Sequence, residues 1–162
     1  MPDQEQRQKD ELWMQQAIAC AQKAADIEEV PVGAVLVLDD EVIGEGWNQP
    51  ITTHNPVAHA EIIALQQAAQ ALNNYRLLNT TLYVTLEPCT MCVGAIVHSR
   101  VKRLVFGAYD AKAGAVSSQI ELLAAKFNNH HVESVGGVMQ FQCAELLTNF
   151  FSQLRSNRKG VE

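Results

Sequence analysis

The chain has 162 residues, of which 48% are hydrophobic and 19% charged, so it has the size and composition of one globular domain and is not a disordered or fibrous protein. The net charge of −6, taken as an average, argues against a nucleic-acid-binding protein, because a surface that contacts phosphates needs Lys and Arg. The charge is uneven, however: residues 1–61 carry three basic and twelve acidic residues, a net −9, whereas residues 62–162 carry nine basic and six acidic residues, a net +3.

The first half of the chain predicts a helix, a hairpin and a second helix. The predicted elements are a helix at 10–28, strands at 32–38 and 41–47, and a helix from just before His59 to Leu72. Apolar residues recur at helical spacing in the two helices, and the β-branched runs flank the turn residues Asp39 and Asp40. Asn55 followed by Pro56 has the pattern of a helix cap with proline at the first helical position.

The second half alternates strands with helices. The predicted strands are 81–86, 104–108 and 132–139, and the predicted helices are 89–98, 118–127 and 143–155. Glu87 and Pro88 are expected to open the first of these helices. Strands that alternate with helices pair in parallel through right-handed crossovers. Joined to the leading hairpin, they predict an α/β fold of three layers (α/β/α) with a central mixed sheet of about five strands.

No linker or repeat divides the sequence, so we expect a single domain over residues 1–162 with frayed ends at about 1–8 and 156–162. No apolar run approaches the roughly 18 to 20 residues of a membrane span, and the polar start lacks the apolar stretch of a signal peptide. We therefore expect a cytoplasmic protein that does not bind membranes.

The four cysteines, Cys20, Cys89, Cys92 and Cys143, are too few and too unevenly spaced for a disulfide framework. In a reducing compartment the close pair is better interpreted as metal-binding or redox-active. Cys20 and Cys143 are expected to pack as small apolar residues.

Two short motifs, each at the start of a predicted helix, carry the candidate chemistry. They are His59-Ala60-Glu61 and Pro88-Cys89-Thr90-Met91-Cys92. Cys89 and Cys92 are three residues apart, so in a helical turn they face the same way and can bind one ion, with His59 as a third ligand. Three protein ligands with one open position are typical of a catalytic zinc site, whereas a structural site normally has a fourth ligand.

Glu61 lies two positions beyond His59 and is not needed as a ligand. Zinc lowers the pKa of a bound water to near 7, and a neighbouring carboxylate can carry protons to a substrate and its leaving group. Taken singly, a histidine, a glutamate or a Cys-x-x-Cys pair also occurs by chance or for packing, and a redox dithiol is the main alternative for Cys89 and Cys92. The combination is far more specific and predicts a zinc-dependent hydrolase.

These motifs resemble those of the cytidine and deoxycytidylate deaminase superfamily, in which a His-x-Glu and a Pro-Cys-x-x-Cys motif form the zinc site. From about Trp13 to Arg155 the chain is more closely similar to the bacterial tRNA-specific adenosine deaminases. The further strings that carry this likeness are EVPVGAV from Glu29, GEGWN from Gly44, YVTLEP from Tyr83, HSR from His98 and NFF from Asn149. The resemblance implies a cytidine deaminase-like fold.

The resemblance also implies roles for individual residues. It implies one zinc ion per chain, held by His59, Cys89 and Cys92. It implies that Glu61 is the catalytic proton carrier, that Asn48 contacts the target nucleoside and that the Ala60 backbone N–H touches the base. Similar enzymes convert adenosine to inosine at the wobble position of an arginine tRNA anticodon, release ammonia and work as homodimers.

Two further substrate-binding residues are expected from the same likeness. Asp110 matches an acidic position that faces the anticodon backbone, although a solvated turn residue is an equal alternative. Of Phe150 and Phe151, one is expected to pack the last helix on the sheet, while the other, Phe151, is a candidate to stack beside a flipped nucleotide.

Three functions remain open at this point: an RNA-editing adenosine deaminase, a deaminase of a free nucleobase or nucleotide, and a non-catalytic zinc module. The zinc module is the weakest, because it lacks a fourth ligand and gives Glu61 no purpose. The likeness outside the zinc motifs favours the RNA enzyme. So does a possible phosphate-facing patch of Arg100, Lys102, Arg103 and Lys112, for which a solvated loop edge is the alternative.

Overall fold

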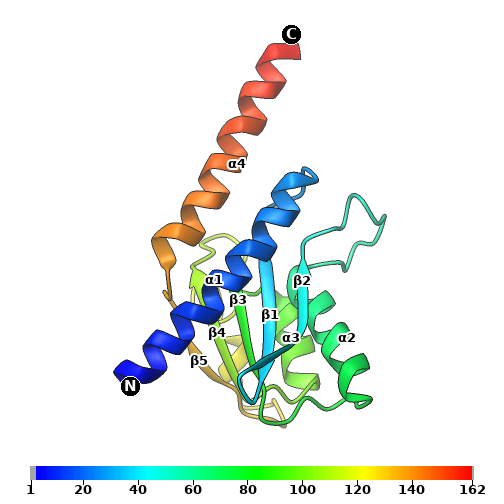
Figure 1. The fold of residues 1–162 in the computed structure, drawn as a ribbon, viewed down its shortest axis with the longest axis vertical. Helices are drawn as coiled ribbons and strands as arrows, with labels where there is room; N and C mark the ends of the chain where they lie inside the picture. The colour runs from blue at the N-terminus through cyan, green and yellow to red at the C-terminus, as the bar shows by residue number, and fades with distance from the viewer. Residues whose placement is uncertain (1–2, 162) are drawn as a thin grey trace.

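A computed structural model describes residues 3–161, which form one five-stranded sheet with helices on both faces (Figure 1). The strands are β1 (Gly33–Leu38), β2 (Glu41–Trp47), β3 (Thr81–Leu86), β4 (Arg103–Ala108) and β5 (Glu133–Val135). Their order across the sheet is β2-β1-β3-β4-β5. β1 is antiparallel to β2 and β3, whereas β3, β4 and β5 are parallel. The predicted mixed sheet of five strands is confirmed.

The helices form two layers around this sheet. They are α1 (Gln4–Asp26), α2 (Ala60–Leu72), α3 (Thr90–His98) and α4 (Gln140–Val161). α1 and α4 cover one face and α2 and α3 the other (Figure 1). Successive side chains of a strand point to opposite faces. Val35 accordingly joins Met14 of α1 in one apolar cluster, while its neighbour Leu36 joins Ile96 of α3 in the other.

The predicted hairpin is also confirmed, and its turn explains the two aspartates. Asp39 and Asp40 both have positive φ, 51° and 60°, which is the geometry of a two-residue turn whose twist matches that of the flanking strands. Aspartate tolerates this left-handed region better than most residues do. The turn therefore fixes the register in which Leu38 of β1 pairs with Glu41 of β2.

A glycine in β2 brings α2 unusually close to the sheet. A Cβ added at Gly46 would lie 2.4 Å from the backbone oxygen of Ala60, which is too short for any side chain. Gly44 is equally tight, since its Cβ would lie 2.3 Å from the Ala64 oxygen. The first turn of α2 is therefore held against the end of β2, and this turn carries the first of the two candidate motifs.

The two ends of the chain are more helical than the sequence predicts. α1 begins at Gln4, not at residue 10, because the Asp3 side chain accepts a hydrogen bond from the Gln6 N–H at 2.8 Å and so caps the helix. α4 runs from Gln140 to Val161, not from 143 to 155. Residues 4–8 and 156–161, where fraying is expected, are thus assigned to helices, while residues 1, 2 and 162 lie outside the described residues.

Other predicted boundaries also differ. Asn55 does not cap α2: its Oδ1 accepts a hydrogen bond from the Val57 N–H within a turn, and His59 is the N-cap. Glu87 and Pro88 precede α3, whose N-cap is Cys89. The helix expected at 118–127 is one 3₁₀ turn, η1 (Leu122–Ala124). The strand expected at 132–139 is cut to β5, because the chain bends at Gly137, whose φ is +85°.

Among residues 3–161, no helix combines the length and the apolarity that crossing a membrane requires.

Candidate active site

The sheet topology gathers the predicted site residues at one end. β2 and β3 each run antiparallel to β1, which lies between them, and β4 runs parallel to β3. The carboxyl ends of these three strands therefore share one edge. Asn48 follows β2, Cys89 follows β3 and Asp110 follows β4. We call the segments 48–61, 87–92 and 109–118 the carboxyl edge.

Helix N-termini present the three candidate metal ligands. His59 is the N-cap of α2 and Cys89 is the N-cap of α3, each with extended backbone, and Cys92 lies in the first turn of α3. At such positions the unpaired backbone N–H groups and the positive end of the helix dipole favour negative charge. Thiolates are thereby stabilised where a cation would bind.

The distances between the donor atoms fit a zinc ion. His59 Nδ1 lies 3.6 Å from the Cys89 Sγ and 3.5 Å from the Cys92 Sγ, and the three donor atoms all lie within 4.8 Å of one another. A tetrahedral zinc ion, with bonds of about 2.0 Å to nitrogen and 2.3 Å to sulfur, separates a nitrogen ligand from a sulfur ligand by about 3.5 Å. A nitrogen and two sulfurs are also the donors that zinc prefers.

The two thiols have opposite pKa shifts. Hydrogen bonding with Cys92 and His59 lowers the pKa of the Cys89 thiol to about 3, whereas the neighbouring Cys89 sulfur and burial raise the pKa of Cys92. Two adjacent sulfurs therefore share a proton. A redox dithiol would not need His59 within reach of both sulfurs, so the geometry favours a metal site.

Glu61 lies in the first turn of α2 and its side chain is buried, with 4% exposure. Burial raises the pKa of its carboxyl to about 7. A carboxyl that titrates near neutral pH can both accept and release a proton, which is the property needed for general acid–base chemistry. Glu61 lies beside the three donors without being one of them.

Asn48 and Ala60 contact each other. The Asn48 Oδ1 accepts a hydrogen bond from the Ala60 N–H at 2.9 Å. The N–H that the resemblance assigns to the base thus donates to Asn48 in this structure. The bond fixes the orientation of the Asn48 amide, so that its NH₂ group is the end left to donate to a ligand.

Asp110 and Phe151 have different surroundings. The Asp110 Oδ1 accepts hydrogen bonds from the N–H groups of Lys112 and Ala113, both at 3.1 Å, so it caps its own turn. Phe150 contacts Phe151 edge to face, with 5.4 Å between ring centroids. Phe151 is 40% exposed, whereas Phe150 lines a groove.

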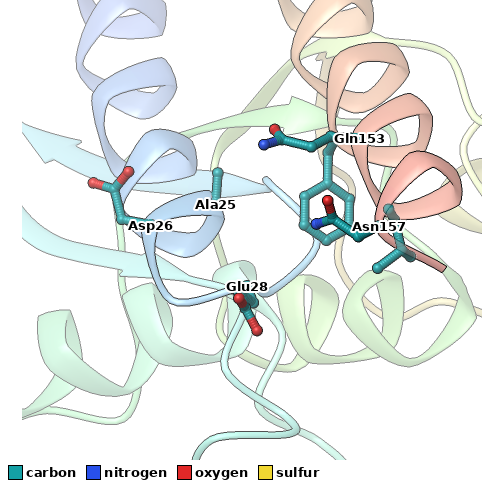
Figure 2. Close-up of a pocket in the computed structure, with 7 residues that line it drawn as sticks. Ala25, Asp26, Glu28, Gln153 and Asn157 are labelled. Atoms are coloured by element: carbon teal, nitrogen blue, oxygen red, sulfur yellow. The ribbon is translucent and has the colours of Figure 1, made fainter. Parts of the chain in front are cut away.

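That groove, of about 490 Å³, lies between the end of α1 and α4 (Figure 2). Gln153 and Asn157 of α4 lie on one side of it, and the end of α1 with Ala25 and Asp26 lies on the other, with Glu28 below; the Asp26 carboxylate points away from α4 (Figure 2). Its described lining includes none of the candidate metal ligands, so the groove is separate from the carboxyl edge.

The basic residues do not form the expected single patch. Arg100, Lys102 and Arg103 lie at the start of β4, whereas Lys112 follows its end. Six residues of strand span about 20 Å, so the two groups lie at opposite edges of the sheet. Arg103 is moreover paired with Asp10 at 2.7 Å and its side chain is only 13% exposed. The interpretation as one phosphate-facing surface is wrong.

The sequence motifs did not identify two buried glutamates at this end of the sheet. Glu87 accepts hydrogen bonds from the segment after β4, and Glu29 accepts two from Thr52, at 2.7 and 2.9 Å, in the segment after β2. Their side chains are 2% and 1% exposed. In each case the signal in the sequence was a charged residue close to an apolar strand, since Glu87 directly follows β3 and Glu29 lies shortly before β1.

Comparisons with known proteins identify deaminases as the relatives of this chain. A family model described as MafB19-like deaminase matches residues 8–155. The tRNA-specific adenosine deaminase of Haemophilus influenzae (strain ATCC 51907 / DSM 11121 / KW20 / Rd) is 53% identical over 151 residues, 93% of this chain and 87% of that protein. The tRNA-specific adenosine deaminase of Bacillus subtilis (strain 168) is 46% identical over 152 residues, 94% of each chain.

A solved structure from a study of A-to-I editing by tRNA:A34 deaminases at the wobble position of transfer RNA has a TM-score of 0.81. It is 41% identical in sequence, and the alignment covers 83% of this chain and 98% of that one. The same three-layer fold is thus present in both.

Proposed function

The chain belongs to the MafB19-like deaminases and to the tRNA-specific adenosine deaminases, and from this premise we propose that it deaminates adenosine to inosine at the wobble position of a tRNA anticodon. The reaction is a hydrolysis: water replaces the amine at C6 of the adenine, and ammonia leaves. The observation that carries the proposal is the position of buried Glu61 beside the donor set of His59, Cys89 and Cys92. We propose one domain over residues 1–162.

His59, Cys89 and Cys92 would hold one zinc ion, as their donor spacing supports. When bound there, zinc supplies an electrophile that brings the pKa of a water near 7. The three ligands come from two helix N-termini packed on the same face of the sheet. A rigid scaffold of this kind holds a ligand set better than loops alone.

In this proposal Glu61 moves the protons. Deamination of adenine needs a proton at N1, to make C6 electrophilic, and then another on the departing amine. Glu61 is buried, and its carboxyl pKa lies near 7, so one group can deliver and recover protons at neutral pH. No other residue of the described first turn of α2 has a titratable side chain.

Asn48 is proposed to orient the nucleoside. Its carbonyl oxygen is held by the Ala60 N–H, which leaves the NH₂ as a donor of fixed direction. Ala60 therefore acts on the substrate through Asn48. Asp110 and Phe151 are proposed to contact the RNA: Asp110 follows β4 at the carboxyl edge, and the Phe151 ring is 40% exposed and available to stack.

The proposed partner is an anticodon stem-loop, that of an arginine tRNA in particular, bound by a homodimer in the cytoplasm. Support for the dimer comes from exposed apolar side chains beside α2 and α3. Tyr75, which follows α2, and Phe127, which follows η1, are 73% and 79% exposed, and a Cβ added at Gly94 of α3 would meet no atom within 4 Å. Tyr75 lines a hollow between α2 and α3, and Phe127 lines a second hollow beside α3.

The function is tested with a stem-loop that carries adenosine at the wobble position. Free adenosine, cytosine, guanine and deoxycytidylate are assayed beside it, and a stem-loop with adenosine only outside the wobble position is the matched control. Inosine is expected in the wobble RNA alone. Turnover of a free base with no turnover of the RNA would instead support the alternative, a nucleobase or nucleotide deaminase on the same scaffold.

A further inference from the structure

We infer that Glu87 is a positioning residue: its buried carboxylate locks the segment 110–118 onto the strand end that carries Cys89, and so sets where Asp110 meets the RNA. The role of Asp110 in this inference rests on the proposed function. The locking of the segment does not, because it follows from hydrogen bonds within the chain. Glu87 does not contact the reacting atoms in this scheme.

The carboxylate of Glu87 binds almost only backbone donors. Its Oε2 accepts hydrogen bonds from the N–H groups of Val116, Ser117 and Ser118 at 3.1, 2.8 and 3.0 Å. Its Oε1 accepts the Asp110 N–H at 3.1 Å and the Ser118 hydroxyl. Five donors converge on a side chain that is 2% exposed. Buried charge is tolerated when it is hydrogen-bonded in this way.

These bonds close the segment at both ends. Asp110 opens it and Ser118 ends it, and both bind the same carboxylate. Gly114 lies between them, and a Cβ there would approach the carboxylate oxygens to 2.4 and 2.5 Å. The backbone therefore wraps directly around the charge, with no side chain interposed at this point.

The same segment is joined to the candidate metal ligands. The Glu87 N–H donates to the Ala108 oxygen at 2.8 Å, and the Ala115 N–H donates to the Pro88 oxygen at 2.9 Å. Pro88 directly precedes Cys89. The segment that carries Asp110 and the strand end that carries a ligand are thus fixed to each other by both backbone and side-chain bonds.

A carboxylate is required because every partner is a donor. Glutamine keeps one acceptor oxygen and places an NH₂ on the other side. The best arrangement for Glu87→Gln keeps the oxygen on the three N–H groups and lets the Ser118 hydroxyl accept from the NH₂. The Asp110 N–H then faces another donor, so the hydrogen bond that is lost is the one that holds Asp110.

The experiment compares Glu87→Gln with Glu121→Gln. Glu121 is an exposed glutamate of the following segment whose side chain makes no capping hydrogen bond. Limited trypsin digestion follows cleavage after Lys112, inside the locked segment, and after Lys126 outside it; both lysines are exposed. Glu87→Gln should speed cleavage after Lys112 by about tenfold and leave Lys126 unchanged, because local opening costs less free energy once bonds to a charge are lost.

The kinetic arm uses the wobble stem-loop and the zinc-loaded protein. Glu87→Gln should raise KM about tenfold with kcat within about threefold, the signature of lost binding and not of lost chemistry. Ser118→Ala, which removes one donor and keeps the charge, should shift both readouts in the same direction by a smaller factor, and it replaces Glu87→Gln should that variant not fold.

Unchanged cleavage after Lys112 would overturn the locking of the segment. Faster cleavage with an unchanged KM, or a fall in kcat at unchanged KM, would overturn the link to substrate positioning. If neither the unmodified protein nor Glu121→Gln deaminates the RNA, the proposed function is refuted. The digestion would still show whether Glu87 locks the segment 110–118.

Discussion

Asp10 and Glu61 are buried at opposite edges of the sheet and have opposite surroundings. At the edge where β4 begins, which we call the amino edge, Asp10 accepts two hydrogen bonds of 2.7 Å from Arg103 and one of 2.9 Å from Tyr83. At the carboxyl edge, Glu61 is buried with no basic side chain bound to it among the ion pairs of the described residues. Asp10 therefore has a fixed cation, Arg103, as its partner, whereas Glu61 has none among these ion pairs.

The pKa shifts follow this difference. Burial raises the pKa of the Asp10 carboxyl, but hydrogen bonds from Arg103, Tyr83 and Gln6 outweigh burial and leave the pKa below its usual value. For Glu61 burial dominates and the pKa rises to about 7. The amino edge therefore holds a permanent charge that serves stability, whereas the carboxyl edge keeps a carboxyl that can exchange a proton.

Removing the metal ligands is expected to have the largest effect. Cys92→Ala should lower zinc from about one ion per chain to none and abolish deamination, because two ligands do not hold the ion against solvent. Metal content is measured by mass spectrometry of the purified protein. Cys20→Ala, at a buried thiol of α1, is the matched control and should keep its zinc; zinc and activity in Cys92→Ala would contradict the metal site.

Glu61→Ala should keep zinc and lose about a thousandfold or more in kcat, the scale of a removed general acid–base. Single-turnover assays on the wobble stem-loop measure this loss, and metal analysis checks the zinc. Glu121→Ala serves as the exposed-glutamate control. Normal turnover by Glu61→Ala would exclude this residue from proton transfer.

At the amino edge we expect loss of stability without loss of chemistry. Asp10→Asn leaves Arg103 without its carboxylate, and breaking a buried ion pair costs about 3 kcal/mol or more of unfolding free energy. Urea denaturation measures the change. The kcat of the folded fraction should stay within about twofold, because Asp10 lies at the far edge; a large fall in kcat at native stability would break the distinction between the two edges.

The amino edge should also give the protein a pH-dependent stability. Since the folded pKa of Asp10 lies below its ordinary value of 3.8, its stabilisation is fully present above about pH 4 and is lost as the pH falls through the lowered folded pKa. The difference in Tm between the unmodified protein and Asp10→Asn should therefore shrink below pH 4. A difference that stays constant down to pH 2 would contradict the assigned charge.

The smallest effect is expected for a surface pair beside the same edge. Lys9 and Asp40 lie 3.8 Å apart, with side chains 46% and 70% exposed. Exposed pairs contribute at most about 1 kcal/mol, so Lys9→Ala should change the unfolding free energy by about 0.5 kcal/mol or less. Urea denaturation at low and high salt tests this, and a cost similar to that of Asp10→Asn would remove the contrast between buried and exposed pairs.

Sequence patterns predicted the strands better than the helix ends. β1, β2 and β3 follow from their apolar runs, and the turn at Asp39 and Asp40 from two residues. The start of α1 was missed because it depends on one side-chain cap at Asp3, and the true cap of α2 is His59, which has no side-chain hydrogen bond to its helix. The residue at which a helix begins depends on a few local hydrogen bonds, which helix propensity does not predict.

The sequence by itself determined which residues form the candidate metal site, because His59, Cys89 and Cys92 carry their ligand chemistry in residue type and in short spacing. Only the tertiary structure decided what the buried acids do. Asp10 accepts hydrogen bonds from Arg103, which lies 93 positions away in the sequence, and Glu87 accepts hydrogen bonds from donors 23 to 31 positions away. Whether a buried carboxyl is paired, exchanges protons or holds a loop depends on its neighbours in space, which local periodicity does not encode.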